Sequence, residues 1–181
     1  QLSNRLHEHG IQWWDRQLGE YEALPHLSDL DELWDEVYRK GFSVDPADYP
    51  FWLLTARSMQ YSWGGNVSIQ MIREVAGNVA GHDGIMINSA RAREMGIGEG
   101  DRIEVSSPVC AVRGRAVLRQ GIRPDTILML AQFGHWKTPF AKDFDTPSLN
   151  RLVPMHIDLI DGGGSSNDAA KVSVERVGPP S

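Results

Sequence analysis

The pattern of apolar and polar positions divides the chain into a helical first part and a β-rich remainder. Ser28 is suited to cap a helix and Gly41 to end it. Between them, apolar side chains recur at the i, i+3, i+4, i+7, i+8 spacing of one helical face: Leu30, Leu33, Trp34, Val37 and Tyr38. We therefore predict an amphipathic helix over about residues 28–40 that packs on a neighbouring domain, with the Trp13–Trp14 pair as a second docking surface.

The segment from Gly41 to Pro50 predicts a linker. Pro46 and Pro50 disfavour both a helix interior and a central strand. We place a domain boundary here, so that residues 1–49 form an N-terminal extension and residues 50–178 form a second domain.

Beyond residue 50 the apolar runs are short and are separated by polar turns. Strands are predicted over Phe51–Leu54, Ile85–Ile87, Arg102–Val105, Cys110–Leu118, Thr126–Leu130 and Lys171–Val177. Short helices are predicted over residues 67–75 and 90–95. The first strand opens into a polar loop, and the turn at Gly100–Asp101 reverses the chain into another buried strand. This pattern predicts a mainly β protein with short helices, in which a β-barrel carries a ligand loop at its rim.

Composition and charge narrow the functional classes. The net charge is −6, and the 18 basic residues are scattered among 24 acidic ones, which argues against a nucleic-acid partner. The single cysteine, Cys110, excludes an internal disulfide framework and any cysteine-held zinc or iron–sulfur site in this chain, and we expect it to be a buried strand residue. No apolar run reaches the roughly 18–20 residues that cross a bilayer. From the first residue, Gln1 rather than Met, we expect a fragment or a processed piece.

The loop from residue 55 to residue 66 is the strongest candidate for ligand binding. It offers hydrogen-bond donors and an indole ring that can cover a planar ligand: Thr55, Arg57, Gln60, Tyr61, Ser62, Trp63 and Asn66. Arg57 can donate two parallel hydrogen bonds to phosphate oxygens. On the residues alone, a polar surface loop whose arginine pairs with a carboxylate is equally consistent.

Two later segments are weaker candidates. The segment after the strand Thr126–Leu130 contains Gln132, His135 and Trp136, but no second ligand stands at the spacing of a zinc site. The run from Gly162 to Asn167 would let backbone N–H groups approach an anion, or would serve as a surface linker. The sequence has neither a nucleophile elbow nor a supported Cys–His pair, so no catalytic residue is predicted.

Taken in order, several segments resemble the C-terminal dinucleotide-binding domain of molybdopterin oxidoreductases of the dimethyl sulfoxide reductase family. They are the strand at Phe51, the Thr-x-Arg loop, the run INSARAREMGIGEGDRIEV and the strand pair that follows, over about residues 50–177. The resemblance implies a double-psi β-barrel similar to that of aspartate decarboxylase. In this family the loop after the first strand contacts the pterin and the pyrophosphate, although many members have His where Tyr61 stands. The resemblance extends cofactor contacts to Gln132, His135, Trp136, Asn150, Ser166 and Asn167. Asp158–Leu159 departs from the Asp-Pro of the family.

The resemblance implies a cofactor-holding domain rather than a self-sufficient enzyme. It would hold a bis(molybdopterin guanine dinucleotide) cofactor with molybdenum or tungsten, jointly with domains absent from this chain. The helix over residues 28–40 and the Trp13–Trp14 segment would pack on those absent domains. The expected partners are the remainder of a bacterial or archaeal catalytic subunit, periplasmic or cytoplasmic, and an iron–sulfur electron-transfer subunit. The sequences of the loops most resemble those of the branch that acts on sulfur or arsenic oxyanions.

Two alternatives stay open. One is a stand-alone double-psi barrel that acts as a binding or adaptor module without a metal cofactor. The other is a small barrel enzyme similar to aspartate decarboxylase, although the self-processing Gly-Ser start of that family has no match in place here.

Overall fold

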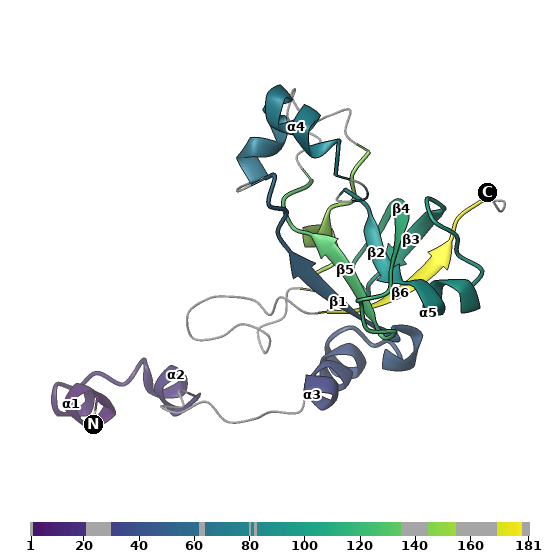
Figure 1. The fold of residues 1–181 in the computed structure, drawn as a ribbon. Coiled ribbons are helices and arrows are strands. Elements are labelled where there is room, and N and C mark those ends of the chain that lie inside the picture. Colours follow the sequence, from purple (N-terminus) through teal and green to yellow (C-terminus); the bar gives the residue numbers. More distant parts are fainter. Residues whose placement is uncertain are drawn as a thin grey trace.

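Six strands form a closed barrel in the computed structural model, which describes residues 2–20, 30–61, 64–79, 81, 83–134, 145–154 and 170–178 (Figure 1). The strands are β1 (Phe51–Ala56), β2 (Ile85–Asn88), β3 (Arg102–Ser106), β4 (Ala111–Arg119), β5 (Thr126–Leu130) and β6 (Ala170–Arg176). The helices are α1 (Leu2–Glu8), α2 (Asp15–Glu20), α3 (Leu30–Glu36), α4 (Gln70–Ala76) and α5 (Ser89–Glu94). A π-helix covers Val37–Gly41, and 3-10 turns cover Pro46–Asp48, Gly64–Ser68 and Leu149–Arg151.

The order of strands around the barrel is β1-β5-β2-β4-β3-β6, with β6 closing onto β1. The β1–β5 and β2–β4 pairs are parallel, and the other pairs are antiparallel. The pairing is symmetric between the two halves of the barrel, β1–β3 and β4–β6. When β1, β2 and β3 are replaced by β4, β5 and β6, and the reverse, every pair becomes an observed pair of the same direction. The barrel is therefore built from two interlocked halves of the same topology. The predicted fold, mainly β with short helices around a double-psi barrel, is confirmed.

The barrel interior follows from the alternation of side chains along the strands. In β2, β3 and β5, alternate apolar residues are buried and belong to one core cluster: Ile85, Ile87, Ile103, Val105, Ile127 and Met129. The predicted strands match the observed ones to within about two residues at each end, because each strand is an apolar run bounded by polar turns.

The predicted amphipathic helix is present, but its apolar face packs on the barrel of this chain. Three of its side chains are buried in the same core cluster as the barrel strands: Trp34, Val37 and Tyr38. The Trp34 ring meets the Trp52 ring of β1 edge-on, with 6.4 Å between centroids. The prediction that this face packs on an absent domain is therefore wrong, because β1 itself supplies the apolar surface that the helix covers.

Polar contacts fix the same helix to the last strand. The Tyr38 hydroxyl donates to the Lys171 carbonyl and accepts from the Lys171 N–H at 3.1 Å. The Lys171 ammonium lies 2.6 Å from the Asp35 carboxylate and 5.3 Å from the centroid of the Trp52 ring. Residues 35–38 and the last strand are thus joined beside β1, and α3 covers this side of the barrel (Figure 1).

Two local predictions are wrong. The helix expected over residues 67–75 is split: Gly64–Ser68 forms a 3-10 turn, and α4 begins only at Gln70 because Ile69 is extended, with φ −79° and ψ 113°. Cys110 is half-buried and lies outside β4. It ends the reversal between β3 and β4, where the Ser107 N–H donates to the Cys110 carbonyl at 2.8 Å.

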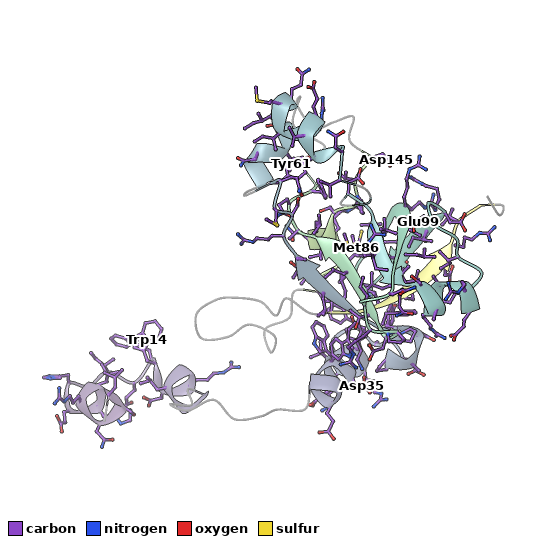
Figure 2. The ribbon with its side chains drawn as sticks, viewed as in Figure 1. Trp14, Asp35, Tyr61, Met86, Glu99 and Asp145 are labelled. Atoms are coloured by element: carbon purple, nitrogen blue, oxygen red, sulfur yellow. The ribbon has the colours of Figure 1, made fainter. Side chains whose placement is uncertain are left out.

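The turn between α1 and α2 presents the tryptophan pair to solvent. Trp13 is 71% exposed and Trp14 is 52% exposed. Figure 2 labels Trp14 in this part of the chain. A docking role for this pair stays a prediction. Among the helices that the structure describes, none has the length and apolar character needed to cross a membrane.

Candidate functional site

The candidate site lies at the edge of the barrel where β1 and β5 both end. These strands are parallel, and Ala56, the last residue of β1, pairs with Leu130, the last residue of β5. The Ala131 N–H also donates to the Ala56 carbonyl at 3.1 Å. The segments that follow the two strands therefore leave from the same edge, although about 70 residues separate them in the sequence. The antiparallel strand β2 begins at this edge as well.

Two buried residues of the second segment hold the first segment in place. The Gln132 side-chain amide donates from Nε2 to the Tyr61 carbonyl at 3.0 Å. The Phe133 ring meets the Tyr61 ring edge-on, with 5.7 Å between centroids. All three residues are at most 5% exposed. The loops predicted to share a ligand thus form one packed unit in the part that the structure describes.

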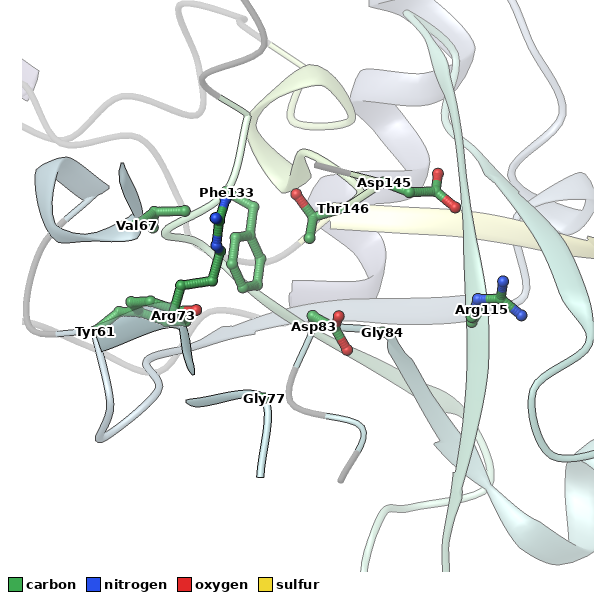
Figure 3. A pocket seen from close by; sticks show the side chains of 10 residues that line it. All are labelled: Tyr61, Val67, Arg73, Gly77, Asp83, Gly84, Arg115, Phe133, Asp145 and Thr146. Atoms are coloured by element: carbon green, nitrogen blue, oxygen red, sulfur yellow. The ribbon is translucent and has the colours of Figure 1, made fainter. Parts of the chain in front are cut away.

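A cavity of about 270 Å³ opens beside this unit (Figure 3). Its walls come from five parts of the chain: the loop after β1, α4, the approach to β2, the middle of β4 and the segments around the loop after β5. The lining residues are Tyr61, Val67, Arg73, Gly77, Asp83, Gly84, Arg115, Phe133, Asp145 and Thr146. Such a volume is at the small end of ligand sites and accommodates one ring system rather than a dinucleotide.

The cavity wall is largely apolar but carries four charged side chains. Tyr61, Val67 and Arg73 lie on one side, and Arg115 and Asp145 lie on the other (Figure 3). Asp145 pairs with Arg102 of β3, whereas Arg115 forms no ion pair with any residue that the structure describes. A cation that lines a concave surface without a carboxylate partner suits an anionic group of a ligand.

The Tyr61 hydroxyl is held in its protonated form. Burial raises the pKa of Tyr61 first, and the negative charge of Asp83 raises it further, while the Arg73 guanidinium opposes this shift. Tyr61 is therefore a hydrogen-bond donor and acceptor at neutral pH, and not a phenolate.

Gln132 carries an unsatisfied acceptor. Its Oε1 atom is shielded from solvent and has no hydrogen-bond partner among the described residues. The Tyr61 carbonyl can only accept, so the NH₂ group must face it and the oxygen must face the other way. A buried acceptor without a donor costs about 1–3 kcal/mol, which marks this atom as one that a ligand could satisfy.

The segment after residue 144 borders the same edge. Asp145 and Thr146 line the cavity. Gly134 approaches Ser148 so closely that a Cβ atom on Gly134 would lie 2.4 Å from the Ser148 Oγ. Asn150 follows in an exposed position of the 3-10 turn Leu149–Arg151.

The structure describes seven of the predicted cofactor-binding residues. Tyr61 lines the cavity, and Gln132 is buried and bonded to the Tyr61 carbonyl. Thr55 is half-buried near the end of β1, and Arg57 and Asn150 are exposed. Gln60 accepts from the Ser58 hydroxyl at 2.6 Å, and Asn66 is half-buried in its 3-10 turn. The remaining six lie outside the described residues: Ser62, Trp63, His135, Trp136, Ser166 and Asn167.

The sequence did not point to three charged residues of the cavity wall: Arg73, Asp83 and Arg115. Arg115 occupies an outward position of β4, in an alternation of exposed and buried residues that was visible in the sequence. Such alternation gives the face of a strand but not the neighbours of that face, which depend on barrel closure. No cluster of three or more His, Cys, Asp or Glu side chains that could hold a metal ion occurs within the described part of the chain.

Comparisons with known proteins identify the family of this chain. A family model described as the molydopterin dinucleotide binding domain matches residues 51–170. The molybdopterin-containing subunit ArrA of the arsenate respiratory reductase of Shewanella sp. (strain ANA-3) is 29% identical over 168 residues, which cover 87% of this chain and 19% of the relative. The subunit of the same name from Chrysiogenes arsenatis is 27% identical over 160 residues, which cover 82% of this chain and 18% of the relative.

This chain therefore spans about a fifth of the length of the curated relatives that it matches. Among solved structures, acetylene hydratase from Pelobacter acetylenicus has a similar fold, with a TM-score of 0.66 over 90% of this chain and 22% of the hydratase chain. The sequence identity is 15%, so this likeness shows the fold alone.

Proposed function

This chain belongs to the molydopterin dinucleotide binding domain family, and we propose that it holds part of a molybdopterin guanine dinucleotide cofactor in a larger oxidoreductase. One observation carries the proposal. The segments after β1 and β5 meet at one barrel edge and border a cavity that presents an arginine, and the segment after β5 contains a buried amide oxygen without a described partner. This combination suits a ligand with a phosphate and a ring that carries N–H groups.

The described residues fit such a group in size and in chemistry. The cavity is large enough for one ring system, and Arg115 and Tyr61 would meet its polar edges. The remainder of the dinucleotide would extend along the two loops, where we assign contacts to Thr55, Arg57, Gln60, Asn66, Gln132 and Asn150. We assign the same role to the residues predicted in the loops beyond them: Ser62, Trp63, His135, Trp136, Ser166 and Asn167.

The bound group would supply the redox chemistry of a molybdenum or tungsten centre, in the bis form that the resemblance implies. This chain would bind the organic part, orient it and exclude water from it. We propose that the chain is not catalytic by itself and works with the remainder of a catalytic subunit and with an iron–sulfur electron-transfer subunit. The length of the curated relatives, of which this chain covers 19% and 18%, supports a longer catalytic subunit.

We assign the substrate to the arsenic and sulfur oxyanions. Support for arsenic oxyanions comes from the names of two curated relatives, each a subunit of an arsenate respiratory reductase. No residue of this chain is assigned to substrate binding, since the proposed task of the domain is to hold the cofactor.

A binding measurement tests the proposal. The chain is titrated with molybdopterin guanine dinucleotide, and the titration is repeated with Arg57→Ala. Loss of a charged bidentate contact should weaken binding by about 10- to 100-fold. Arg39→Ala is the matched control, because Arg39 is also an exposed arginine but lines a cavity at Trp52 and Lys171, away from the β1–β5 edge.

The control should bind as the unchanged chain does. Equal binding by the unchanged chain and Arg57→Ala would remove Arg57 from the site. The absence of any binding to the unchanged chain would contradict the proposed function itself.

A further inference from the structure

The two interlocked halves of the barrel use a side-chain amide in the same way. In one half the amide belongs to Asn88, the last residue of β2; its Nδ2 donates to the Ile122 carbonyl, in the turn that follows β4, at 2.6 Å. In the other half the amide belongs to Gln132, just beyond β5; its Nε2 donates to the Tyr61 carbonyl, in the loop that follows β1, at 3.0 Å. The two contacts are equivalent under the symmetry of the barrel, in which β2 corresponds to β5 and β4 corresponds to β1.

The oxygens of the two amides differ. Asn88 Oδ1 accepts from two adjacent donors, the N–H groups of Ala90 at 2.9 Å and of Arg91 at 3.0 Å, at the start of α5. Gln132 Oε1 is buried and accepts from no residue that the structure describes. The chain thus satisfies one amide oxygen with a pair of peptide N–H groups and leaves its counterpart at the cofactor edge open.

We propose that the open oxygen of Gln132 binds the paired N–H groups of a 2-amino-4-oxopyrimidine ring. This ring edge presents a ring N–H and an amino N–H side by side, as Ala90 and Arg91 present their N–H groups to Asn88. The edge occurs in guanine and also in a pterin, so the chemistry is shared by two parts of one cofactor. The inference rests on the proposed function and deepens it by naming the atom that selects the ring.

The surroundings of Gln132 explain why this contact would discriminate. The side chain is 5% exposed, and its second polar atom is already committed to Tyr61. Since Oε1 is shielded from solvent, a ligand reaches it only when the side chains around it move, and water is then excluded from the new contact. A ring without the amino group would leave the buried oxygen with a missing donor.

The experiment compares ligand pairs that differ at the amino group. The complete chain is titrated calorimetrically with guanosine diphosphate and inosine diphosphate, and separately with pterin and lumazine, in which an oxygen replaces the amino group. We expect about 5- to 100-fold tighter binding of the amino-bearing member in at least one pair. The pair that discriminates identifies the source of the ring, guanine or pterin.

Substitutions assign the discrimination to Gln132. Gln132→Met should remove it by weakening the amino-bearing ligand, with inosine diphosphate or lumazine bound as before. In Gln132→Glu, a buried carboxyl group in its protonated form can donate to the Tyr61 carbonyl and keep one acceptor oxygen, so this variant should retain the preference. It also covers the case in which the methionine variant does not fold. Gln120→Met, an exposed glutamine in the turn after β4, is the matched control and should bind and discriminate as the unchanged chain does.

Amide NMR provides an independent readout. The side-chain NH₂ signals of Gln132 should shift with the amino-bearing ligand. Equal binding within both pairs, or discrimination that survives in Gln132→Met, would overturn the inference and leave the proposed function standing. If the chain binds none of the four ligands and also fails to bind molybdopterin guanine dinucleotide, the inference and the proposed function fall together.

Discussion

At the scale of single residues, Gly134 joins the loop after β5 to the segment that contains Ser148. Its φ of +117° is in a region that other residues rarely adopt, and a Cβ atom would lie 2.4 Å from the Ser148 Oγ and 2.8 Å from the Ser148 Cβ. We predict that Gly134→Ala destabilises the protein by about 2–4 kcal/mol, through backbone strain and steric overlap. The measurement is the free energy of unfolding from a denaturant titration.

Two other glycines separate these causes. Gly100 also has a positive φ, +82°, but a Cβ atom there meets nothing within 4 Å, so Gly100→Ala reports strain alone. Gly121 has open space and no such φ, and Gly121→Ala should change stability by less than about 0.5 kcal/mol. A Gly134→Ala protein as stable as Gly121→Ala would show that the two segments do not meet as closely as described.

Some residues of the candidate site could be predicted from the sequence, whereas the contacts between them could not. Tyr61 and Gln132 follow strand ends that the apolar pattern identifies, and the family resemblance adds the expectation that they contact a cofactor. The contact between them could not be predicted, because it depends on the parallel pairing of β1 with β5 across about 70 residues. Arg115 was missed for the same reason: its position facing the cavity follows from the register of β4 beside β2.

At the scale of elements, Tyr38 ties the π-helix after α3 to β6. Its hydroxyl exchanges two hydrogen bonds with the backbone of Lys171. Tyr38→Phe leaves the half-buried carbonyl and N–H of Lys171 without this partner, so we predict a loss of about 1–3 kcal/mol at neutral pH. Denaturant titrations of the two proteins measure this difference.

The Tyr38 hydroxyl should also make the free energy of unfolding depend on pH. Burial raises the pKa of the Tyr38 hydroxyl far above its ordinary value, while the hydrogen bond with Lys171 opposes the shift. Because the pKa is higher in the folded protein than in the unfolded chain, the stabilisation is complete below about pH 10 and is lost as the pH rises above it. Between about pH 8 and pH 11 the unchanged protein should therefore lose more stability than Tyr38→Phe. Parallel losses in the two proteins would show that the hydroxyl titrates normally.

At the scale of the whole molecule, the sequence predicted the barrel better than its boundary. The short apolar runs predicted the strands, because each strand is one apolar run bounded by polar turns. The boundary near residue 49 was inferred from Pro46 and Pro50, which report only on local backbone. The stripe on α3 could not reveal which surface it covers, and the structure places Trp34, Val37 and Tyr38 in the barrel core. A separate extension over residues 1–49 thus stays a prediction, and the core contacts favour a folding unit that begins near residue 30.

Two truncated chains decide between these boundaries. A chain of residues 30–178 keeps Trp34 against Trp52 and Tyr38 against Lys171, whereas a chain of residues 50–178 exposes the apolar surface that they cover. Removal of Trp34 alone should cost about 3–5 kcal/mol, so we expect the shorter chain to unfold at much lower denaturant concentration or not to fold. Trp34→Ala in the complete chain is the control, because it removes the same contact without shortening the chain. Equal stability of the two truncated chains would return the boundary to residue 49.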